Sequence, residues 1–167
     1  NGLVGSEMCI RDRLNAIQRD GVPYDLISKS LPTVEGAVND ILAQVVDFSI
    51  VFTMNGKDID THIVYDDDRI WSLELSSGME RFISSLAIRI GLMNVSNLPQ
   101  GNFLAIDEGW GTMDSDNLNS VAQLFQYLKS QFQFTFVVSH IETMRDFVDT
   151  LLEIKKVDGS SSVRFSR

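Results

Sequence analysis

The sequence has a single cysteine, a deficit of positive charge and no long hydrophobic run. Its one cysteine, Cys9, excludes a framework of internal disulfides. No apolar run approaches the ~20 residues that a membrane-spanning helix needs. The formal net charge of −9 argues against general attraction to nucleic acid. The basic residues near the C-terminus are Lys155, Lys156, Arg164 and Arg167. We interpret them as a solvated strand end rather than a DNA-binding patch.

A phosphate-binding loop is also absent. The pattern Gly-x-x-x-x-Gly-Lys-Ser/Thr occurs nowhere, and the Gly56-Lys57 pair has no matching glycine upstream. Without that loop, nothing in the sequence cradles the β-phosphate of a nucleotide or offers it a hydroxyl for Mg²⁺. Sustained heptads are missing too, so no long coiled coil is predicted.

The N-terminal third shows little regular pattern before a first helix. Residues 1–13 follow neither a helical nor a strand period, and we expect an artefact or a disordered tail there. Residues 14–31 hold a short amphipathic piece broken by Gly21 and Pro23, and Pro32 then opens a helical pattern. Its apolar residues recur at three- and four-residue steps, at Val34, Ala37, Val38, Ile41, Leu42, Val45 and Val46.

Strand patterns follow. Alternating apolar residues over 48–52 lead to Asn55-Gly56, a pair that favours a tight hairpin turn. Further strands are predicted at 63–65 and 70–75, around the acidic turn 66–68. Three adjacent aspartates can bind a metal, but we favour a simple hairpin tip.

From Ser77 onward, helix and strand patterns alternate. This predicts an α/β fold with a parallel sheet and flanking helices, preceded by an antiparallel part. The expected elements are a helix at 80–94, a strand at 103–106, a helix from 115 or 116, a strand at 134–138, a helix at 141–149, and strands at 152–156 and 163–165.

Two carboxylates, Asp107 and Glu108, come directly after the apolar strand at 103–106. They therefore lie where a buried strand ends, which is where open α/β sheets bind ligands. In nucleoside triphosphatases an aspartate at this place holds Mg²⁺, and the next acid polarises the attacking water. A strand that ends in two solvated acids gives the same pattern.

The segment Leu75-Ser-Ser-Gly-Met-Glu80 precedes the apolar helix. A helix start presents backbone N–H groups and the positive end of the helix dipole to an anion, and the Ser77 hydroxyl can donate as well. The same residues also form an ordinary capping box, with Ser77 at the N-cap and Glu80 at N3. The two interpretations are compatible, because a capped helix start is still an anion site.

Two more features lie near the acids. The run from Gly109 to Asp114 contains two glycines that allow close backbone approach, and Asp114 can cap the next helix. His140 ends the apolar strand at 134–138, at the edge of the sheet where the acids are expected. A phosphate-facing role and a structural role are both open for His140.

The order of these features resembles the C-terminal half of an ABC-type ATPase head. Within that superfamily the sequence is similar to the SbcC group of DNA-repair ATPases, relatives of the SMC proteins. The resemblance is best over 75–156 and looser over 32–74. It rests on three runs: Glu80-Arg-Phe-Ile-Ser-Ser-Leu-Ala, Ile106-Asp-Glu-Gly-Trp-Gly-Thr-Met-Asp and Ser139-His-Ile-Glu-Thr-Met.

The resemblance implies a role for each matching residue. They are the signature serine and its first glycine (Ser77 and Gly78), the Mg²⁺ aspartate (Asp107), the catalytic glutamate (Glu108), the D-loop aspartate (Asp114) and the switch histidine (His140). Met79 departs from the family pattern, which usually has a second glycine there.

The resemblance also implies ATP and Mg²⁺ as ligands, and no membrane. Its implied partners are an N-terminal Walker A lobe with a coiled coil, a second head in a homodimer, an SbcD-type nuclease, and DNA through the assembled complex. Residues 14–31 would lead out of the coiled coil and 32–167 would form the lobe, inactive alone because the phosphate loop is absent. The implied location is cytoplasmic, at the nucleoid or a viral replication site. The alternatives are an SMC-, RecN- or RecF-like ATPase that tethers DNA without a nuclease, and a non-catalytic dimerisation lobe.

Overall fold

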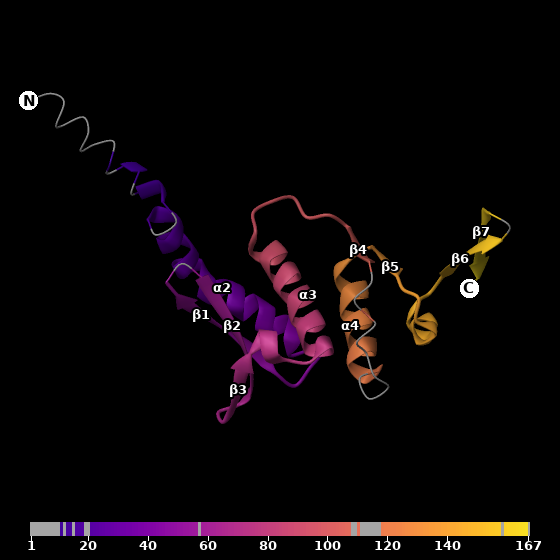
Figure 1. Ribbon diagram of the computed structural model, residues 1–167, viewed down its shortest axis with the longest axis horizontal. Coiled ribbons are helices and arrows are strands. Elements are labelled where there is room, and N and C mark those ends of the chain that lie inside the picture. The colour runs from indigo at the N-terminus through magenta and orange to yellow at the C-terminus, as the bar shows by residue number, and fades with distance from the viewer. Residues whose placement is uncertain are drawn as a thin grey trace, which may run out of the picture. The chain divides into compact units, whose positions relative to one another are not determined.

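The chain forms two compact units, Asn1–Gln100 and Gly101–Arg167. A computed structural model describes residues 11, 13–14, 16–18, 21–56, 58–107, 110, 118–157 and 159–166. The first unit joins two helices to an antiparallel sheet, and the second contains a parallel strand pair, a helix and a C-terminal hairpin (Figure 1). This agrees with the predicted α/β fold that combines antiparallel and parallel parts.

Helix α2 (Val22–Leu42) is the longest element of the first unit. Pro23 lies in its first turn, where a missing N–H costs nothing. Pro32 lies inside the helix, so the prediction that a helix opens at Pro32 is wrong. An interior proline costs ~3 kcal/mol, but packing of one helix face offsets that cost. The buried residues of this face are Val34, Val38, Ile41 and Leu42.

Helix α3 (Gly78–Val95) packs against α2. It begins two residues earlier than predicted and ends one residue later. Gly91 is buried at the contact, where a glycine lets the two helices approach closely. The buried residues of α3 are Ile83, Ser84, Leu86, Ala87, Ile90 and Gly91.

The antiparallel sheet has the order β1-β2-β3 (Ser49–Asn55, Asp58–Asp66 and Arg69–Ser72). The predicted tight turn is confirmed, because Gly56 has a φ of 61°. Residues Leu73–Leu75 form a short 3₁₀ helix, η1, so the prediction of a strand through Leu75 is wrong there. The Ser72 hydroxyl accepts a hydrogen bond from the Glu74 N–H and starts this turn.

Side chains of α2 pair with the backbone of strand β1, which is the edge strand of this sheet. Asn39 donates from Nδ2 to the Ile50 carbonyl (2.9 Å) and accepts at Oδ1 from the Ile50 N–H (2.8 Å). A carboxylate oxygen of Glu35 accepts from the Phe52 N–H at 2.7 Å. The helix thereby satisfies backbone groups that an edge strand leaves unpaired.

The second unit contains the predicted parallel strands. Strand β4 (Phe103–Asp107) pairs in parallel with β5 (Phe134–Val138), and helix α4 (Leu118–Gln131) connects them. The buried residues of α4 include Val121, Leu124, Phe125 and Leu128, which recur at helical spacing on one face. The predicted start of α4 lies outside the described residues.

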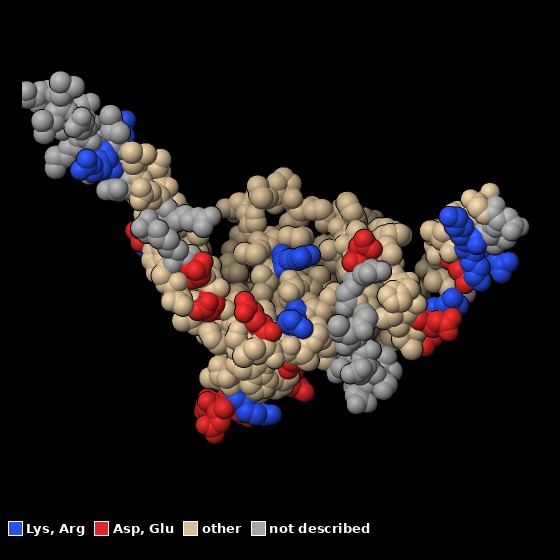
Figure 2. Space-filling view, in the orientation of Figure 1, with Lys and Arg blue, Asp and Glu red and all other residues tan. Residues whose placement is uncertain are grey.

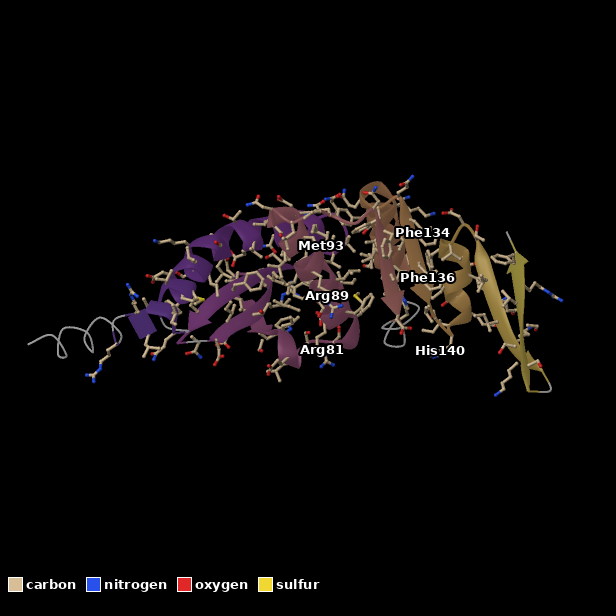
Figure 3. All side chains as sticks on the ribbon, turned by 90° about the horizontal axis from the view of Figure 1, so that it is seen from above. Arg81, Arg89, Met93, Phe134, Phe136 and His140 are labelled. Carbon is tan, nitrogen blue, oxygen red and sulfur yellow. The ribbon has the colours of Figure 1, made fainter. Side chains whose placement is uncertain are left out.

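One face of the β4–β5 pair is exposed and aromatic. Phe103 and Phe134 are register partners and are 64% and 59% exposed, and Phe136 is 44% exposed. Phe134 and Phe136 follow one another along β5 (Figure 3). We call Phe103, Phe134 and Phe136 the aromatic face.

The chain ends in strands β6 (Leu151–Val157) and β7 (Ser160–Ser166), which form an antiparallel hairpin longer than predicted. Lys155, Lys156 and Arg164 are exposed on it, and Figure 2 shows basic side chains gathered there.

Before the hairpin, Glu142–Phe147 is the 3₁₀ helix η4, so the helix predicted at 141–149 is wrong in type and length. Six residues are too few to offset the cost of starting an isolated α-helix. In the part of the chain that the structure describes, no helix is long and apolar enough to cross a membrane.

Candidate functional site

The parallel strands bring two predicted site residues to one edge of the sheet. Asp107 is the last residue of β4 and is the register partner of Val138, the last residue of β5. His140 follows two residues later (Figure 3), and both Asp107 and His140 are exposed. Because parallel strands end at the same edge, a carboxylate and an imidazole are available at the ligand-binding end of this sheet.

Two other predicted residues, Glu108 and Asp114, lie outside the described residues. Between them, Trp110 is described and only 1% exposed. Its ring stacks on Phe125 of α4 with the ring centroids 5.3 Å apart. Phe125 in turn stacks on Phe147 of η4 at 5.9 Å. Trp110 therefore anchors the chain to the hydrophobic core three residues after Asp107.

Sequence reasoning treated the 109–114 run as a glycine loop and missed this anchor. The available signal was a large aromatic residue between two glycines, directly after a strand end. Such a residue most often marks a buried contact, since exposure of an indole ring is costly.

In the first unit, Ser77 is the N-cap of α3, as predicted. Its Oγ accepts a hydrogen bond from the Glu80 N–H at 3.3 Å, and its own N–H donates to Glu80 Oε2 at 2.6 Å. The predicted capping box is thus confirmed in both directions. The Ser77 side chain also hydrogen-bonds to the Glu80 carboxylate and helps to lower its pKa, so a ligand would compete with that carboxylate for the Ser77 hydroxyl hydrogen.

The remaining donors at this helix start belong to Gly78 and Met79. The N–H groups of Ser77 and Glu80 are used by the capping box. Among the hydrogen bonds of the described residues, none involves the N–H of Gly78 or Met79, so both are available to an anion. Met79 is helical, so this position does not require the conformational freedom of glycine.

A tyrosine from the sheet completes the hydrogen bonding of Glu80. Tyr65 of β2 donates from its hydroxyl to Glu80 Oε1 at 2.7 Å. Burial raises the pKa of Tyr65 to about 12, and the hydrogen bond to Glu80 adds to the rise. Burial alone would raise the pKa of Glu80, but hydrogen bonds from Tyr65 and Ser77 outweigh it and lower that pKa. Both shifts favour the same state, a neutral phenol beside an ionised carboxylate.

Sequence reasoning missed Tyr65, because its partner lies 15 residues away. The signal was strand alternation: Tyr65 is on the same face as Ile63, which is fully buried. A tyrosine on a buried face needs a partner for its hydroxyl.

The acidic turn 66–68 behaves as the hairpin tip that we favoured. Asp66 forms an ion pair with Arg69 at 2.7 Å. Among the described residues, no group of three or more His, Cys, Asp or Glu could hold a metal. Asp107 offers one exposed carboxylate, which fits a Mg²⁺ that takes its other ligands from nucleotide and water.

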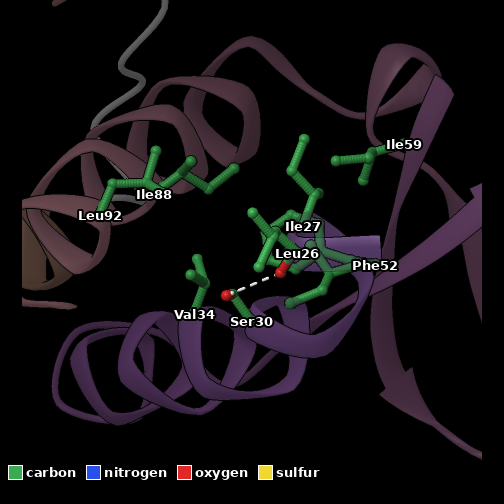
Figure 4. A pocket seen from close by; sticks show the side chains of 9 residues that line it. Leu26, Ile27, Ser30, Val34, Phe52, Ile59, Ile88 and Leu92 are labelled. Carbon is green, nitrogen blue, oxygen red and sulfur yellow. Dashed lines mark hydrogen bonds between the residues drawn. The ribbon is translucent and has the colours of Figure 1, made fainter. Parts of the chain in front are cut away.

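A pocket of about 350 Å³ lies in the first unit, between α2, α3 and the sheet (Figure 4). Among the described residues that line it, the one polar side chain is Ser30, whose hydroxyl donates to the Leu26 carbonyl at 2.9 Å. A phosphate group would find no charged partner there, so this pocket is unsuited to a nucleotide. It is lined by Leu26, Ile27, Ser30, Leu31, Val34, Phe52, Ile59, Ile88 and Leu92.

No protein-family model matches the chain. Among curated proteins, the uncharacterized protein R555 of Acanthamoeba polyphaga mimivirus is 35% identical over 160 residues, which cover 86% of this chain and 12% of R555. The SbcC subunit of the nuclease SbcCD from Staphylococcus aureus (strain JH9) is 30% identical over 118 residues, which cover 68% of this chain and 12% of that protein. The chain therefore spans about an eighth of the length of these relatives.

Solved structures give the fold. A chain from a study of ATP-driven dimerization and DNA-stimulated activation of SMC ATPases superposes with a TM-score of 0.69 at 16% identity, covering 86% of this chain and 89% of the other. The SMC head domain from Thermotoga maritima gives a TM-score of 0.60 at 22% identity, over 86% of this chain and 51% of that domain. The fold is that of an SMC-type ATPase head.

The chain belongs to the SbcC/SMC-like ATPase family and forms one lobe of the head, as its sequence similarity to SbcC and its fold show. The predicted family and fold class are thus confirmed.

Proposed function

We propose that this lobe supplies half of an ATP-hydrolysing site in an SbcC-type DNA-repair head, and that it needs a Walker A lobe to act. The observation that carries the proposal is the pairing of β4 and β5, which ends at Asp107 and leads directly to His140. An acidic and an imidazole side chain at one carboxyl edge are the groups that nucleoside triphosphatases use around the γ-phosphate.

In this proposal the second unit serves the nucleotide held by its own head. Asp107 holds Mg²⁺, which would neutralise charge on the β- and γ-phosphates. Glu108 orients the attacking water and accepts its proton. His140 contacts the γ-phosphate and stabilises charge as it develops. The buried Trp110 supports this arrangement, because it fixes the chain beyond the two acids.

The first unit serves the nucleotide held by a second head. The Ser77 hydroxyl and the N–H groups of Gly78 and Met79 grip the γ-phosphate in trans. Asp114 acts at the same junction as the D-loop aspartate. ATP then joins two copies, and hydrolysis releases them. The free donors at the capped start of α3 support this role.

The partners follow from the relatives. The Staphylococcus aureus relative is named as a component of the SbcCD nuclease, so we propose an SbcD-type nuclease as the partner, acting on DNA through the assembled complex. A coiled coil would link this lobe to the Walker A lobe, with 14–31 leading out of it. The site of action would be cytoplasmic, at the nucleoid or a viral replication site.

The test uses a complete head, formed by joining this chain to a lobe that carries a Gly-x-x-x-x-Gly-Lys-Ser/Thr loop. We call this the reconstituted head. Replacing Glu108→Gln should lower its ATP turnover by a factor of roughly 10²–10⁴, the usual contribution of a general base. Asp25→Asn removes an exposed carboxylate from the first turn of α2, in the other unit, and is the matched control. Equal turnover of the Glu108→Gln variant and the parent would refute the catalytic role and favour a non-catalytic dimerisation lobe.

A second candidate keeps the ATPase cycle but not the nuclease. It is an SMC-, RecN- or RecF-like ATPase that tethers DNA, and it is favoured by the superposition on SMC heads. The two candidates differ in assembly: co-purification of a metallophosphoesterase-type nuclease with the reconstituted head supports the first. DNA-stimulated turnover without such a partner supports the second.

A further inference from the structure

Tyr65 is held rigidly between two elements of the first unit. Its ring stacks on Trp71 of β3 with the centroids 5.3 Å apart, and it meets Phe48 at 5.4 Å on a tilted plane. The Arg69 guanidinium lies over the same ring, 5.3 Å from its centroid. These contacts fix the direction of the tyrosine hydroxyl before any ligand arrives.

Both oxygens of the Glu80 carboxylate are occupied. Oε1 accepts from the Tyr65 hydroxyl at 2.7 Å, and Oε2 accepts from the Ser77 N–H at 2.6 Å. Rotation of the Glu80 side chain would break at least one of these charge-assisted hydrogen bonds. The sheet is thereby connected, through one carboxylate, to the backbone of Ser77.

We propose that Tyr65 is a positioning residue for Ser77: it pins the Glu80 carboxylate, which holds the Ser77 backbone N–H, and so fixes Ser77 at the start of α3 for the γ-phosphate of the opposite head. This inference rests on the proposed function, because it assigns a support to the trans grip. Tyr65 also connects strand β2 to the trans grip, so a displacement of the β2–β3 hairpin would change the affinity of Ser77 for the nucleotide.

Tyr65 would affect phosphate binding because two anions compete for the start of helix α3. A carboxylate in the first turn and a bound phosphate are both stabilised by the positive end of the same helix dipole. Tyr65 holds the Glu80 carboxylate on the side of the sheet, which leaves the Gly78 and Met79 N–H groups to the phosphate. Without the tyrosine hydroxyl, Oε1 loses its partner and the half-buried carboxylate gains freedom to turn toward the incoming phosphate.

The experiment uses the reconstituted head with Glu108→Gln, so that assembly is measured apart from hydrolysis. The readout is the ATP concentration at which half of the heads associate, followed by light scattering. Tyr65→Phe keeps the ring and removes one hydroxyl, and it should raise that concentration about fivefold, the worth of one hydrogen bond. The affinity of dilute, separate heads for a fluorescent ATP analogue should stay unchanged, because the cis site is untouched.

Matched controls come from the same unit. Tyr24→Phe removes a hydroxyl from half-buried Tyr24 of α2, and Glu74→Gln removes an exposed carboxylate from η1. Neither should change assembly. Ser77→Ala should raise the ATP concentration for assembly, and Tyr65→Phe should have a smaller effect in that background than alone, because both residues act on the same phosphate site. Adding Glu80→Gln to Tyr65→Phe should restore much of the lost assembly, because the neutral side chain no longer competes with the phosphate for the helix start.

The outcomes separate this inference from the proposed function. Normal assembly of Tyr65→Phe, with impaired assembly of Ser77→Ala, would overturn the role of Tyr65 and leave the trans grip intact. Normal assembly of Ser77→Ala would overturn the trans grip itself. A loss of cis nucleotide affinity in Tyr65→Phe would show general damage to the fold and would also overturn the positioning role.

Discussion

Gly91 of α3 lies so close to Val38 of α2 that a Cβ added to the glycine would come within 2.6 Å of Val38 Cγ2. The same Cβ would lie 3.3 Å from the Val38 backbone nitrogen. Because valine is stiff at χ1, its methyl group has little room to move away. The distance between the two helices therefore depends on the missing side chain.

Replacing Gly91→Ala should destabilise the first unit. Overpacking costs about 1–3 kcal/mol, against roughly 1 kcal/mol gained from the better helix propensity of alanine. Thermal unfolding followed by circular dichroism measures the difference. Gly36→Ala is the matched control: this glycine is in α2 with nothing within 4 Å of an added Cβ, and alanine there should raise Tm. A higher Tm for Gly91→Ala would contradict the close contact.

Asn39→Ala should remove one of the two side-chain connections between α2 and strand β1. The change deletes both hydrogen bonds to Ile50 and leaves the backbone groups of a fully buried residue without partners. We expect a loss of about 2 kcal/mol in the free energy of unfolding, measured with urea. Gln44→Ala, which removes an exposed side chain that only donates to the Asp40 carbonyl in the last turn of α2, should change it little. Equal effects of the two variants would count against the role of Asn39.

The bond between Tyr65 and Glu80 should make stability depend on pH at both extremes. The pKa of Tyr65 rises on folding from 10.0 to about 12, so its stabilisation is complete below pH 10 and is lost as the pH rises toward 12. The pKa of Glu80 falls below 4.5 on folding, so its stabilisation is present above pH 4.5 and is lost as the pH falls through the lowered value.

The measurement is the difference in Tm between the parent and Tyr65→Phe across this pH range. We expect a constant difference between about pH 5 and pH 10 that shrinks on either side. A difference that stays the same at all pH values would mean that the hydroxyl contributes no ionisation-dependent stability.

The 167-residue chain alone should show no ATP turnover, because it lacks a phosphate loop. The check is a phosphate-release assay on the purified chain, with the reconstituted head as the positive control. Turnover by the chain alone, abolished by Glu108→Gln, would contradict the half-site proposal. Turnover unaffected by that variant would point to a contaminating ATPase.

Local patterns predicted much of the fold. The bounds of β5 and the capping box at Ser77 and Glu80 are as predicted, because both depend on residues close in sequence. The parallel pairing of β4 and β5 followed from the alternation of strands and helices.

The error at Pro32 and the failure to find the role of Tyr65 come from tertiary contacts. Pro32 predicts a helix start by its local chemistry, but burial of the α2 face carries the helix through it. The contact between Tyr65 and Glu80 joins a strand to a helix and leaves no local signature. For the site, Asp107 and His140 were placed at the correct edge from strand ends alone. The roles of Glu108 and Asp114 remain predictions.

The aromatic face of the β4–β5 pair has a practical consequence for handling the protein. A two-stranded sheet that exposes Phe103, Phe134 and Phe136 to water is prone to aggregate. Yield and solubility in a purification should therefore depend on what is expressed alongside the lobe, and detergent or dilution should be needed when it is made by itself. The fraction of aggregated protein in a sample then reports whether a partner covers this face.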